Sequence, residues 1–332
     1  MNAQKPAPHG WLILDKPRGL GSTQAVAAVK RNLREGGYDK TRVGHGGTLD
    51  QLAEGVLPIA LGEATKLAGR LLDSDKAYEF TIQFGEETDT LDAQGEVVQR
   101  TAHRPPLAAV AAILDHFTGD IEQVPPAYSA LKIGGKRASD RARAGEDMDM
   151  KPRAVTIHSL EFPGEREHQP LRSAFATTAG RPDPYDPQAP LELAETVTLV
   201  AHVSKGTYIR SLARDIARAL GTLGYVTYLR RIKAGPFRVG QAISLDNMNG
   251  IGKGAPLRDL LLPLEAGLDD IPALQLDRTS AQAVRQGRVL SDMPQPDGLH
   301  LATLDGVPVA LVEIAGGAAK VVRGFNLPDV AE

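Results

Sequence analysis

GHGGTLDQLAEGVLPIALGEATK, residues 44–66, places a single aspartate, Asp50, between a glycine-rich turn and an apolar segment. Glycine adopts positive φ and has no side chain, so another molecule can come close to the backbone of such a turn. Asp50 would then be the first charged group that this molecule meets. Alternatively, the carboxylate of Asp50 caps a helical turn formed by the following QLAEGVL. His45 lies in the same turn, where a lone histidine is more often structural or merely exposed than functional.

The composition is that of a globular protein without thiol chemistry. The chain has 332 residues, 42% of them apolar, and a formal net charge of −3. This length is enough for a catalytic domain and a smaller appended one. The count of 0 cysteines excludes disulfides, thiolate zinc sites, iron–sulfur clusters and a cysteine nucleophile. No window approaches the roughly 20 apolar residues of a spanning helix, and the N-terminus has no signal-peptide pattern, so we expect a cytoplasmic protein.

Local patterns predict strands and helices on both sides of the opening turn. WLIL predicts a short strand, followed by a Pro/Gly turn and a helix from about Thr23, which Ser22 or Thr23 can cap. KAYEFTIQFG alternates apolar residues with period two, so it predicts a strand with one buried face and Tyr78 near its beginning. Arg210 lies where the turn SKGTY passes into the helical pattern IRSLARDIARAL.

Two segments are read from their composition. Residues 163–190 are rich in proline and in small or polar residues, which predicts a long surface insertion. After about Ala266, short alternating runs separated by glycine turns predict a small β-barrel-like module.

A basic stretch lies between residues 205 and 238, although the whole chain is slightly acidic. Asp215 is its single acid, and its basic residues are Lys205, Arg210, Arg214, Arg218, Arg230, Arg231, Lys233 and Arg238. Such a run predicts a positive face that binds phosphate. The alternative is an ordinary solvated helix face.

Motifs for nucleotides and metals are missing. GLGSTQ and GGAAK do not fit the GxxxxGK[ST] pattern, and GHGGTLD does not fit GxGxxG. HExxH does not occur, and the 8 histidines are scattered without the spacing of metal ligands. We therefore expect no metal and no cofactor.

Between about residues 9 and 245 the chain carries, in this order, HGWLILDKPRGLGSTQAV, GHGGTLDQLAEGVLPIALGEATK, KAYEF, GEETDTLDAQGEV, QVPPAYSALKIGGKRASDRARAGE, VSKGTYIRSLARDIARALG and YLRR. In amino-acid sequence and in order these segments resemble the motifs of the TruB family of bacterial tRNA pseudouridine-55 synthases. The C-terminal segment resembles, in strand pattern and position, the small PUA-type RNA-binding appendage of that family.

The resemblance implies an α/β (α+β) catalytic domain over residues 1–265, built on a mixed, largely antiparallel sheet, and a PUA-like domain over residues 266–332. It implies isomerisation of uridine to pseudouridine at position 55, in the T-loop of tRNA, without a cofactor. The implied partner is tRNA alone, bound by a monomer with no obligate protein partner and no membrane.

Three residues match the catalytic positions of the family. By this resemblance Asp50 is the nucleophile, Tyr78 stacks on the target base and serves in proton transfer, and Arg210 pairs with the catalytic carboxylate. The reaction breaks the C1′–N1 bond and forms C1′–C5 without exchanging electrons. Asp50 either attacks covalently or abstracts the 2′ proton, and both routes stay open. A phosphate contact is the alternative role of Arg210.

Further residues match substrate-binding positions. Leu229 corresponds to the leucine that lines the uracil pocket, His45 to the histidine that fills the RNA loop after the base leaves it, and Lys66 to the lysine that ends GEATK. Phosphate contacts are expected from the basic stretch, namely Lys205, Arg230 and Arg231.

The chain departs from the family pattern around Asp50. Gln51 stands where the family usually has proline, Glu54 where it usually has threonine, and GHGG replaces GHTG. These changes leave the reactive groups in place but affect loop rigidity and the charge presented to RNA.

Two other functions compete with the isomerase. One is a noncatalytic tRNA-binding or folding chaperone on the same scaffold. The other is a hydrolase with an aspartate nucleophile, which needs a second carboxylate such as Asp73, Asp75 or Glu79. None of these acids lies in a persuasive motif.

Overall fold

The computed structural model describes residues 5–164, 192–251 and 257–327, which form two compact units. The first unit comprises Met1–Gln51, Gly55–Asp73 and Lys233–Glu332, and the second comprises Leu52–Glu54 and Ser74–Ile232. Most of the insertion predicted at 163–190 lies outside the described residues. No helix in the described part of the chain is long and apolar enough to cross a membrane.

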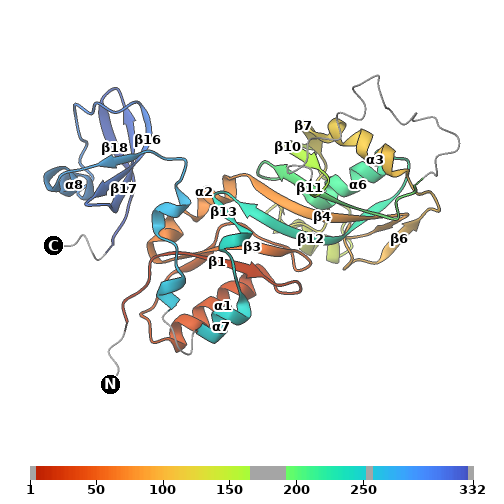
Figure 1. Ribbon diagram of the computed structural model, residues 1–332, viewed down its shortest axis with the longest axis horizontal. Helices are drawn as coiled ribbons and strands as arrows, with labels where there is room; N and C mark the ends of the chain where they lie inside the picture. The colour runs from red at the N-terminus through yellow and green to blue at the C-terminus, as the bar shows by residue number, and fades with distance from the viewer. Residues whose placement is uncertain (1–4, 165–191, 252–256, 328–332) are drawn as a thin grey trace. The chain divides into compact units, whose positions relative to one another are not determined.

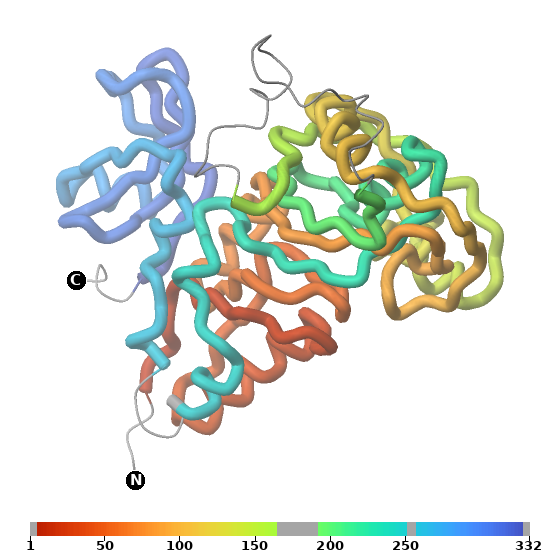
Figure 2. Tube along the Cα trace, turned by 45° about the vertical axis from the view of Figure 1, so that its right-hand side comes forward, coloured from red at the N-terminus to blue at the C-terminus, as the bar shows by residue number. Residues whose placement is uncertain are grey.

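Strand β1 (Gly10–Lys16) lies between β14 and β3 in a sheet of the first unit. It pairs antiparallel with β3 (Glu54–Leu61) and parallel with the short β14 (Ile243–Ser244); Figure 2 draws β1 and β3 in the red to orange part of the trace. The short β2 (Val43–His45) pairs antiparallel with the end of β3. β1 and β3 are buried along almost their whole length, which explains their continuous apolar runs.

Helix α1 (Ser22–Glu35) confirms the helix predicted after the Pro/Gly turn. It buries a stripe of small and aliphatic residues that includes Ala25, Val29 and Leu33, and Gly36 is its C-cap. Asn32 donates to Asn249 Oδ1 at 2.9 Å, which ties α1 to α7 (Leu245–Ile251) beside it (Figure 1).

The C-terminal part of the first unit is a four-stranded sheet in the order β15-β16-β17-β18 with one helix, α8. The bounds are β15 (Ala273–Gln275), α8 (Arg278–Arg285), β16 (Gly298–Leu304), β17 (Val307–Ala315) and β18 (Ala318–Gly324). β15 runs parallel to β16 and the other pairs are antiparallel. The several short strands predicted for this region are therefore confirmed.

Trp11 lies at the centre of the core of the first unit. It is 0% exposed, donates from Nε1 to the carbonyl of Leu264 at 3.0 Å and packs on Phe237. Gly267 comes so close that a Cβ there would lie 2.8 Å from the indole nitrogen. The same core contains Phe325 from the C-terminal end, so the domain boundary at residues 265–266 stays a prediction.

The second unit is built on a sheet in the order β12-β4-β11-β10-β7, in which the pairs from β4 to β7 are antiparallel. Its strands are β4 (Lys76–Phe84), β7 (Gly119–Gln123), β10 (Arg153–Glu161), β11 (Thr196–Val203) and β12 (Gly224–Ala234). These antiparallel pairs, together with the parallel pair of β1 and β14, agree with the mixed, largely antiparallel sheet that was predicted.

Helix α6 (Ile209–Ala219) covers one face of this sheet. A Cβ at Gly224 would lie 2.7 Å from Ala217 of α6 and 3.0 Å from Ile82 of β4. Side chains alternate between the faces of a strand, so Tyr78 points to the same side as Ile82. The face of β4 that carries Tyr78 is therefore the face on which α6 lies.

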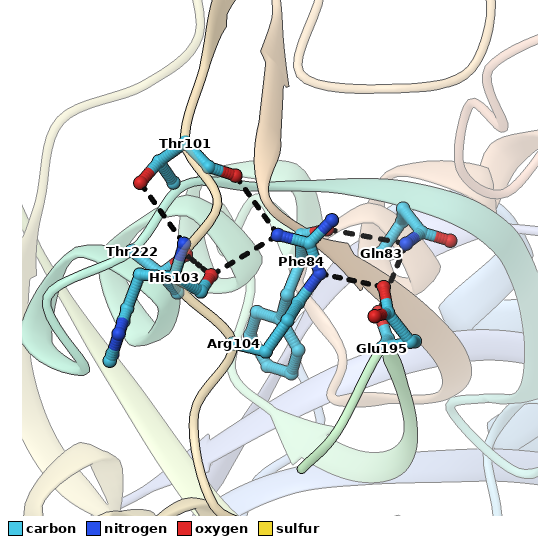
Figure 3. A network of polar contacts seen from close by, with 7 residues as sticks. All are labelled: Gln83, Phe84, Thr101, His103, Arg104, Glu195 and Thr222. Atoms are coloured by element: carbon cyan, nitrogen blue, oxygen red, sulfur yellow. Dashed lines mark hydrogen bonds and ion pairs between the residues drawn. The ribbon is translucent and has the colours of Figure 1, made fainter.

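A polar network around Arg104 holds the far end of β4 (Figure 3). Arg104 forms an ion pair with Glu195 at 2.6 Å and donates to the carbonyls of Thr101 and His103. A Cβ at Gly85, whose φ is +95°, would lie 1.9 Å from the Arg104 guanidinium. Only glycine therefore fits this close approach without displacing the guanidinium.

Short elements complete the two units. In the second unit they are β5 (Glu86–Thr88) paired with β6 (Val97–Arg100), β8 (Lys132–Ile133) paired with β9 (Lys136–Arg137), α3 (Leu107–Ile113), η2 (Leu114–Phe117) and α4 (Ala138–Arg143). In the first they are η1 (Gly62–Lys66), α2 (Ala68–Asp73), β13 (Phe237–Arg238), η3 (Val239–Gln241), η4 (Leu257–Leu260) and η5 (Leu264–Gly267).

Candidate active site

Asp50 lies exposed in the loop that joins β2 to β3. The residues after it bend and then enter a strand, so no helix begins at this point. The alternative in which Asp50 caps a helical turn of QLAEGVL is therefore wrong, because the apolar residues of that segment build the buried strand β3. The exposed side chain of Asp50 can be reached by another molecule.

The neighbours of Asp50 are hydrogen-bonded to the turn that precedes α1. The Ser22 hydroxyl donates to the carbonyl of Leu49 and accepts from its N–H, both at 2.9 Å. On the other side, the N–H of Gly19 donates to the carbonyl of Gln51 at 2.7 Å. Ser22 was expected to cap the helix; instead Gly21 is the N-cap, and the hydroxyl of Ser22 serves the Asp50 loop.

His45 and Lys66 belong to the same unit as Asp50. His45 is the last residue of β2, half-buried, and its Nδ1 accepts from the N–H of Gly47 at 3.4 Å. Lys66 forms an ion pair with Glu63 at 2.7 Å and donates to the carbonyl of Gly324 at 2.8 Å. Both of these contacts of Lys66 are structural, and its role in binding substrate stays a prediction.

Arg210 is the second residue of α6, and its side chain is buried in the second unit. Its guanidinium donates to the carbonyls of Thr90 at 2.7 Å and Tyr128 at 2.9 Å. It also lies 3.3 Å from the carboxylate of Asp92. A cation with this set of partners is fixed in direction, since each contact restrains the planar guanidinium.

Asp92 is a residue of this site that the sequence reasoning missed. Its Oδ2 faces Arg210, while its Oδ1 accepts from the hydroxyl of Thr90 at 2.7 Å and from the N–H of Gln94 at 3.0 Å. The side chain is only 5% exposed. Asp92 stands in the segment GEETDTLDAQGEV, but the turn-forming residues around it predicted only a loop.

Tyr78 occupies the position that its pattern predicted, near the beginning of β4, and is half-buried. The residues that follow on its face, Phe80, Ile82 and Phe84, are each 0% exposed. Tyr78 is thus the polar, partly open end of an otherwise apolar face. It belongs to the same unit as Arg210, whereas Asp50 belongs to the other, and the pairing of Asp50 with Arg210 stays a prediction.

Leu229 and Arg231 on β12 are buried, with 6% and 1% exposed. An apolar, buried leucine suits a pocket for a base. Because the side chain of Arg231 is buried, an RNA backbone cannot reach it in this structure, and this argues against the phosphate contact that was expected of Arg231.

Three more arginines of the basic stretch form ion pairs, two of them with acids from elsewhere in the chain. Arg218 pairs with Glu87 at 3.0 Å and Arg230 with Glu54 at 3.0 Å, while Arg214 pairs with the neighbouring Asp215 at 2.8 Å. The strongly positive face expected from the sequence is therefore reduced, and Lys205 is the exposed member that remains of the three predicted phosphate contacts.

The unusual Glu54 is half-buried and close to Tyr228 as well as to Arg230. Burial raises the pKa of the Tyr228 hydroxyl, and the carboxylates of Glu79 and Glu54 raise it further, against the opposing effect of Arg230. Glu79 follows Tyr78 directly on β4, so the side chain of Glu79 points to the opposite face of the strand from Tyr78. The extra carboxylate near Asp50 is thus compensated by an arginine.

Strands β8 and β9 form an exposed basic hairpin. Lys132, Lys136 and Arg137 of β8 and β9 are exposed, and none forms an ion pair with any residue that the structure describes. The pattern of this segment predicts a short strand, a turn at Gly134 and Gly135 and a basic helix, which agrees with β8, the turn and α4; the second strand, β9, was not predicted.

The described side chains suit acid–base or nucleophilic chemistry on a base. They offer an exposed carboxylate on a tethered loop, an aromatic ring with a hydroxyl, and a buried, oriented guanidinium. Within the described ranges no three His, Cys, Asp or Glu side chains gather in a way that could hold a metal ion.

Two family models match the chain. Residues 35–180 match the model of the TruB family pseudouridylate synthase N-terminal domain, and residues 210–269 match that of the tRNA pseudouridylate synthase B C-terminal domain.

Similar proteins of known name cover almost the whole chain. A tRNA pseudouridine synthase B of Novosphingobium aromaticivorans is 60% identical over 97% of this chain and 99% of its own length. That of Zymomonas mobilis is 52% identical over 96% of each. Among solved structures, a chain of an H/ACA RNP bound to a substrate RNA matches with a TM-score of 0.66 and 22% identity, covering 97% of this chain and 86% of that one. A chain of a Cbf5-Nop10-Gar1 complex matches with a TM-score of 0.65 and 24% identity, with the same coverage, and both likenesses concern the fold. On the strength of the family models and the high identity over nearly its full length, this chain belongs to the TruB family of pseudouridylate synthases.

Proposed function

We propose that the protein isomerises uridine to pseudouridine at position 55, in the T-loop of tRNA. The observation that carries the proposal is the identity of 60% over 97% of the chain with a tRNA pseudouridine synthase B, with Asp50, Tyr78 and Arg210 all present. An exposed Asp50 and a fixed Arg210 supply the charges that this reaction requires.

Each residue has a part in the reaction. The target base leaves the RNA stack at a cost of a few kcal/mol. Stacking on Tyr78 offsets about 1–3 kcal/mol of that cost. Asp50 then attacks covalently or removes the 2′ proton, the C1′–N1 bond breaks, the uracil turns, and C1′–C5 forms. The free carboxylate is restored as the ester is released or the 2′ proton is returned, C5 loses its proton and N1 gains one, so the product is an isomer of the substrate. Arg210, anchored by Asp92, would orient the carboxylate, while Leu229 would line the base pocket and His45 would fill the vacated space in the RNA loop.

The RNA backbone is bound by exposed cations without a protein partner. We assign this role to Lys205, to the hairpin residues Lys132, Lys136 and Arg137, and to Lys66. Arg230 could join only by exchanging Glu54 for a phosphate. Residues 266–332 would add affinity for tRNA rather than reactive groups. A monomeric enzyme in the cytoplasm, where unmodified tRNA occurs, remains our prediction.

The test is an assay of the purified protein on unmodified tRNA, with pseudouridine and free uracil measured separately. We expect pseudouridine at position 55 and no uracil, and we expect Asp50→Asn to bind tRNA normally without forming product. Release of uracil would indicate a hydrolase, binding without any product would indicate the noncatalytic alternative, and an active Asp50→Asn would remove Asp50 from the chemistry.

A further inference from the structure

The loop of Asp50 is not part of a helix or a strand. It follows the glycines of GHGG, contains Gln51 in place of a proline, and has no regular structure between His45 and Glu54. Asp50 itself is exposed, whereas its neighbours Leu49 and Leu52 are only 4% and 2% exposed. Burial of these neighbours and hydrogen bonds to another segment therefore hold the loop, while the Asp50 side chain stays exposed.

Ser22 makes two hydrogen bonds to this loop. It is 4% exposed, and its hydroxyl bonds reciprocally with both backbone groups of Leu49, the residue directly before Asp50. One hydroxyl acting as donor and acceptor toward the same residue fixes both the position and the rotation of that residue's backbone. The helix does not use this hydroxyl, because Gly21 is its N-cap.

The turn that carries Ser22 is itself braced. Lys16 is 0% exposed, and its ammonium donates to the carbonyls of Pro17 at 3.0 Å and Leu20 at 2.7 Å. From the same turn, the N–H of Gly19 reaches the carbonyl of Gln51, directly after Asp50. Both peptide neighbours of Asp50 are thus tied to one braced turn.

We infer that Ser22 is a positioning residue for the reaction, holding the backbone of Leu49 so that the Asp50 carboxylate is presented in one orientation. The inference rests on the proposed function, because it needs Asp50 to be the reacting group. Without the hydroxyl the loop keeps its covalent path, the Gly19 contact and the bond from the N–H of Gly46 to the carbonyl of Pro58, but Leu49 loses both of its hydrogen bonds to Ser22. Misplacement of a reacting group by about 1 Å costs on the order of 100-fold in rate.

The experiment compares Ser22→Ala with Ser22→Thr, which keeps the hydroxyl. The matched control is Thr222→Val, because Thr222 is also 4% exposed and its hydroxyl donates to one backbone carbonyl, that of His103, at 2.8 Å. Single-turnover rates at saturating unmodified tRNA, affinity for that tRNA, and the folded fraction are measured for each protein.

We expect Ser22→Ala to lose about 10- to 100-fold in single-turnover rate per folded molecule, with affinity within about twofold of wild type. Ser22→Thr should recover most of the rate, and Thr222→Val should lose only stability. A rate for Ser22→Ala equal to that of wild type overturns the inference, as does a loss that the folded fraction fully explains.

Two further outcomes are informative. If the wild-type protein forms no pseudouridine, the proposed function fails, whereas an active wild type with an equally active Ser22→Ala overturns only the positioning role of Ser22. If the Ser22 variants do not fold, amide hydrogen exchange of the wild-type protein decides: the Leu49 N–H must be protected as strongly as the amides of α1, and rapid exchange overturns the inference.

Discussion

Replacing Asp92 by Asn removes a buried negative charge beside Arg210 and keeps the size of the side chain. The retained oxygen can still accept from Thr90 and from the N–H of Gln94, as Oδ1 does now. The new amide group would face the guanidinium 3.3 Å away, donor against donor. The substitution therefore isolates the charge interaction between Asp92 and Arg210.

The geometry sets the expected size of the effect. At 3.3 Å two unit charges attract by about 5 kcal/mol at an effective dielectric constant near 20. Desolvation offsets part of this in the native pair, but removing one partner leaves the other charge buried, at a cost of about 3–5 kcal/mol. Arg210 keeps two carbonyl partners, so we expect Asp92→Asn to lower the free energy of unfolding by about 3 kcal/mol, which is the lower end of this range.

Asp140→Asn is the matched control, since Asp140 lies 3.4 Å from Arg143 but on the surface, with 60% and 68% of the two side chains exposed. A surface pair of this kind contributes about 0.2–1 kcal/mol at most. Urea unfolding measures both variants, and a single-turnover assay at saturating tRNA should show at least a tenfold loss for Asp92→Asn only. If Asp92→Asn loses no more stability than Asp140→Asn, the charge interaction at Arg210 does not have the strength expected of it.

Three other predictions concern base stacking, the RNA backbone and pH. Tyr78→Phe keeps the ring and should bind tRNA as wild type does while turnover falls sharply; equal turnover would leave Tyr78 a packing residue. Lys136→Gln should reduce the slope of log affinity against log salt by about 0.7–0.9, whereas Arg100→Gln should not, and an unchanged slope for Lys136→Gln would exclude it from the interface. Asp277 accepts from the N–H of Ser280 at 2.7 Å, and that bond lowers the pKa of its carboxyl below the usual 3.8. The ionised form therefore stabilises the fold above the ordinary pKa, and this stabilisation is lost as the pH falls through the lowered pKa. The difference in urea midpoint between wild type and Asp277→Ala should accordingly shrink from about pH 5 toward pH 3. A difference that is independent of pH would contradict this.

Features that depend on neighbouring residues could be predicted from the sequence. The period of KAYEFTIQF gave the strand β4 with Tyr78 near its start, and the pattern after SKGTY gave α6 with Arg210 at its beginning. The motif resemblance added the fold and the candidate residues, and the family models and relatives bear out the fold and the family. Strand and helix periods are local properties, so a single chain displays them without its tertiary context.

Features that depend on convergence of distant segments appeared only in the tertiary structure. The basic stretch looked unbalanced because Glu54 and Glu87, which neutralise Arg230 and Arg218, lie far from it in sequence. The sequence suggested Ser22 as a helix cap, yet its hydroxyl bonds to the backbone of Leu49, which lies 27 residues further along the chain and directly before Asp50. An ion pair or a side-chain hydrogen bond requires two groups within a few ångströms, and only the folding of the chain decides which groups come that close.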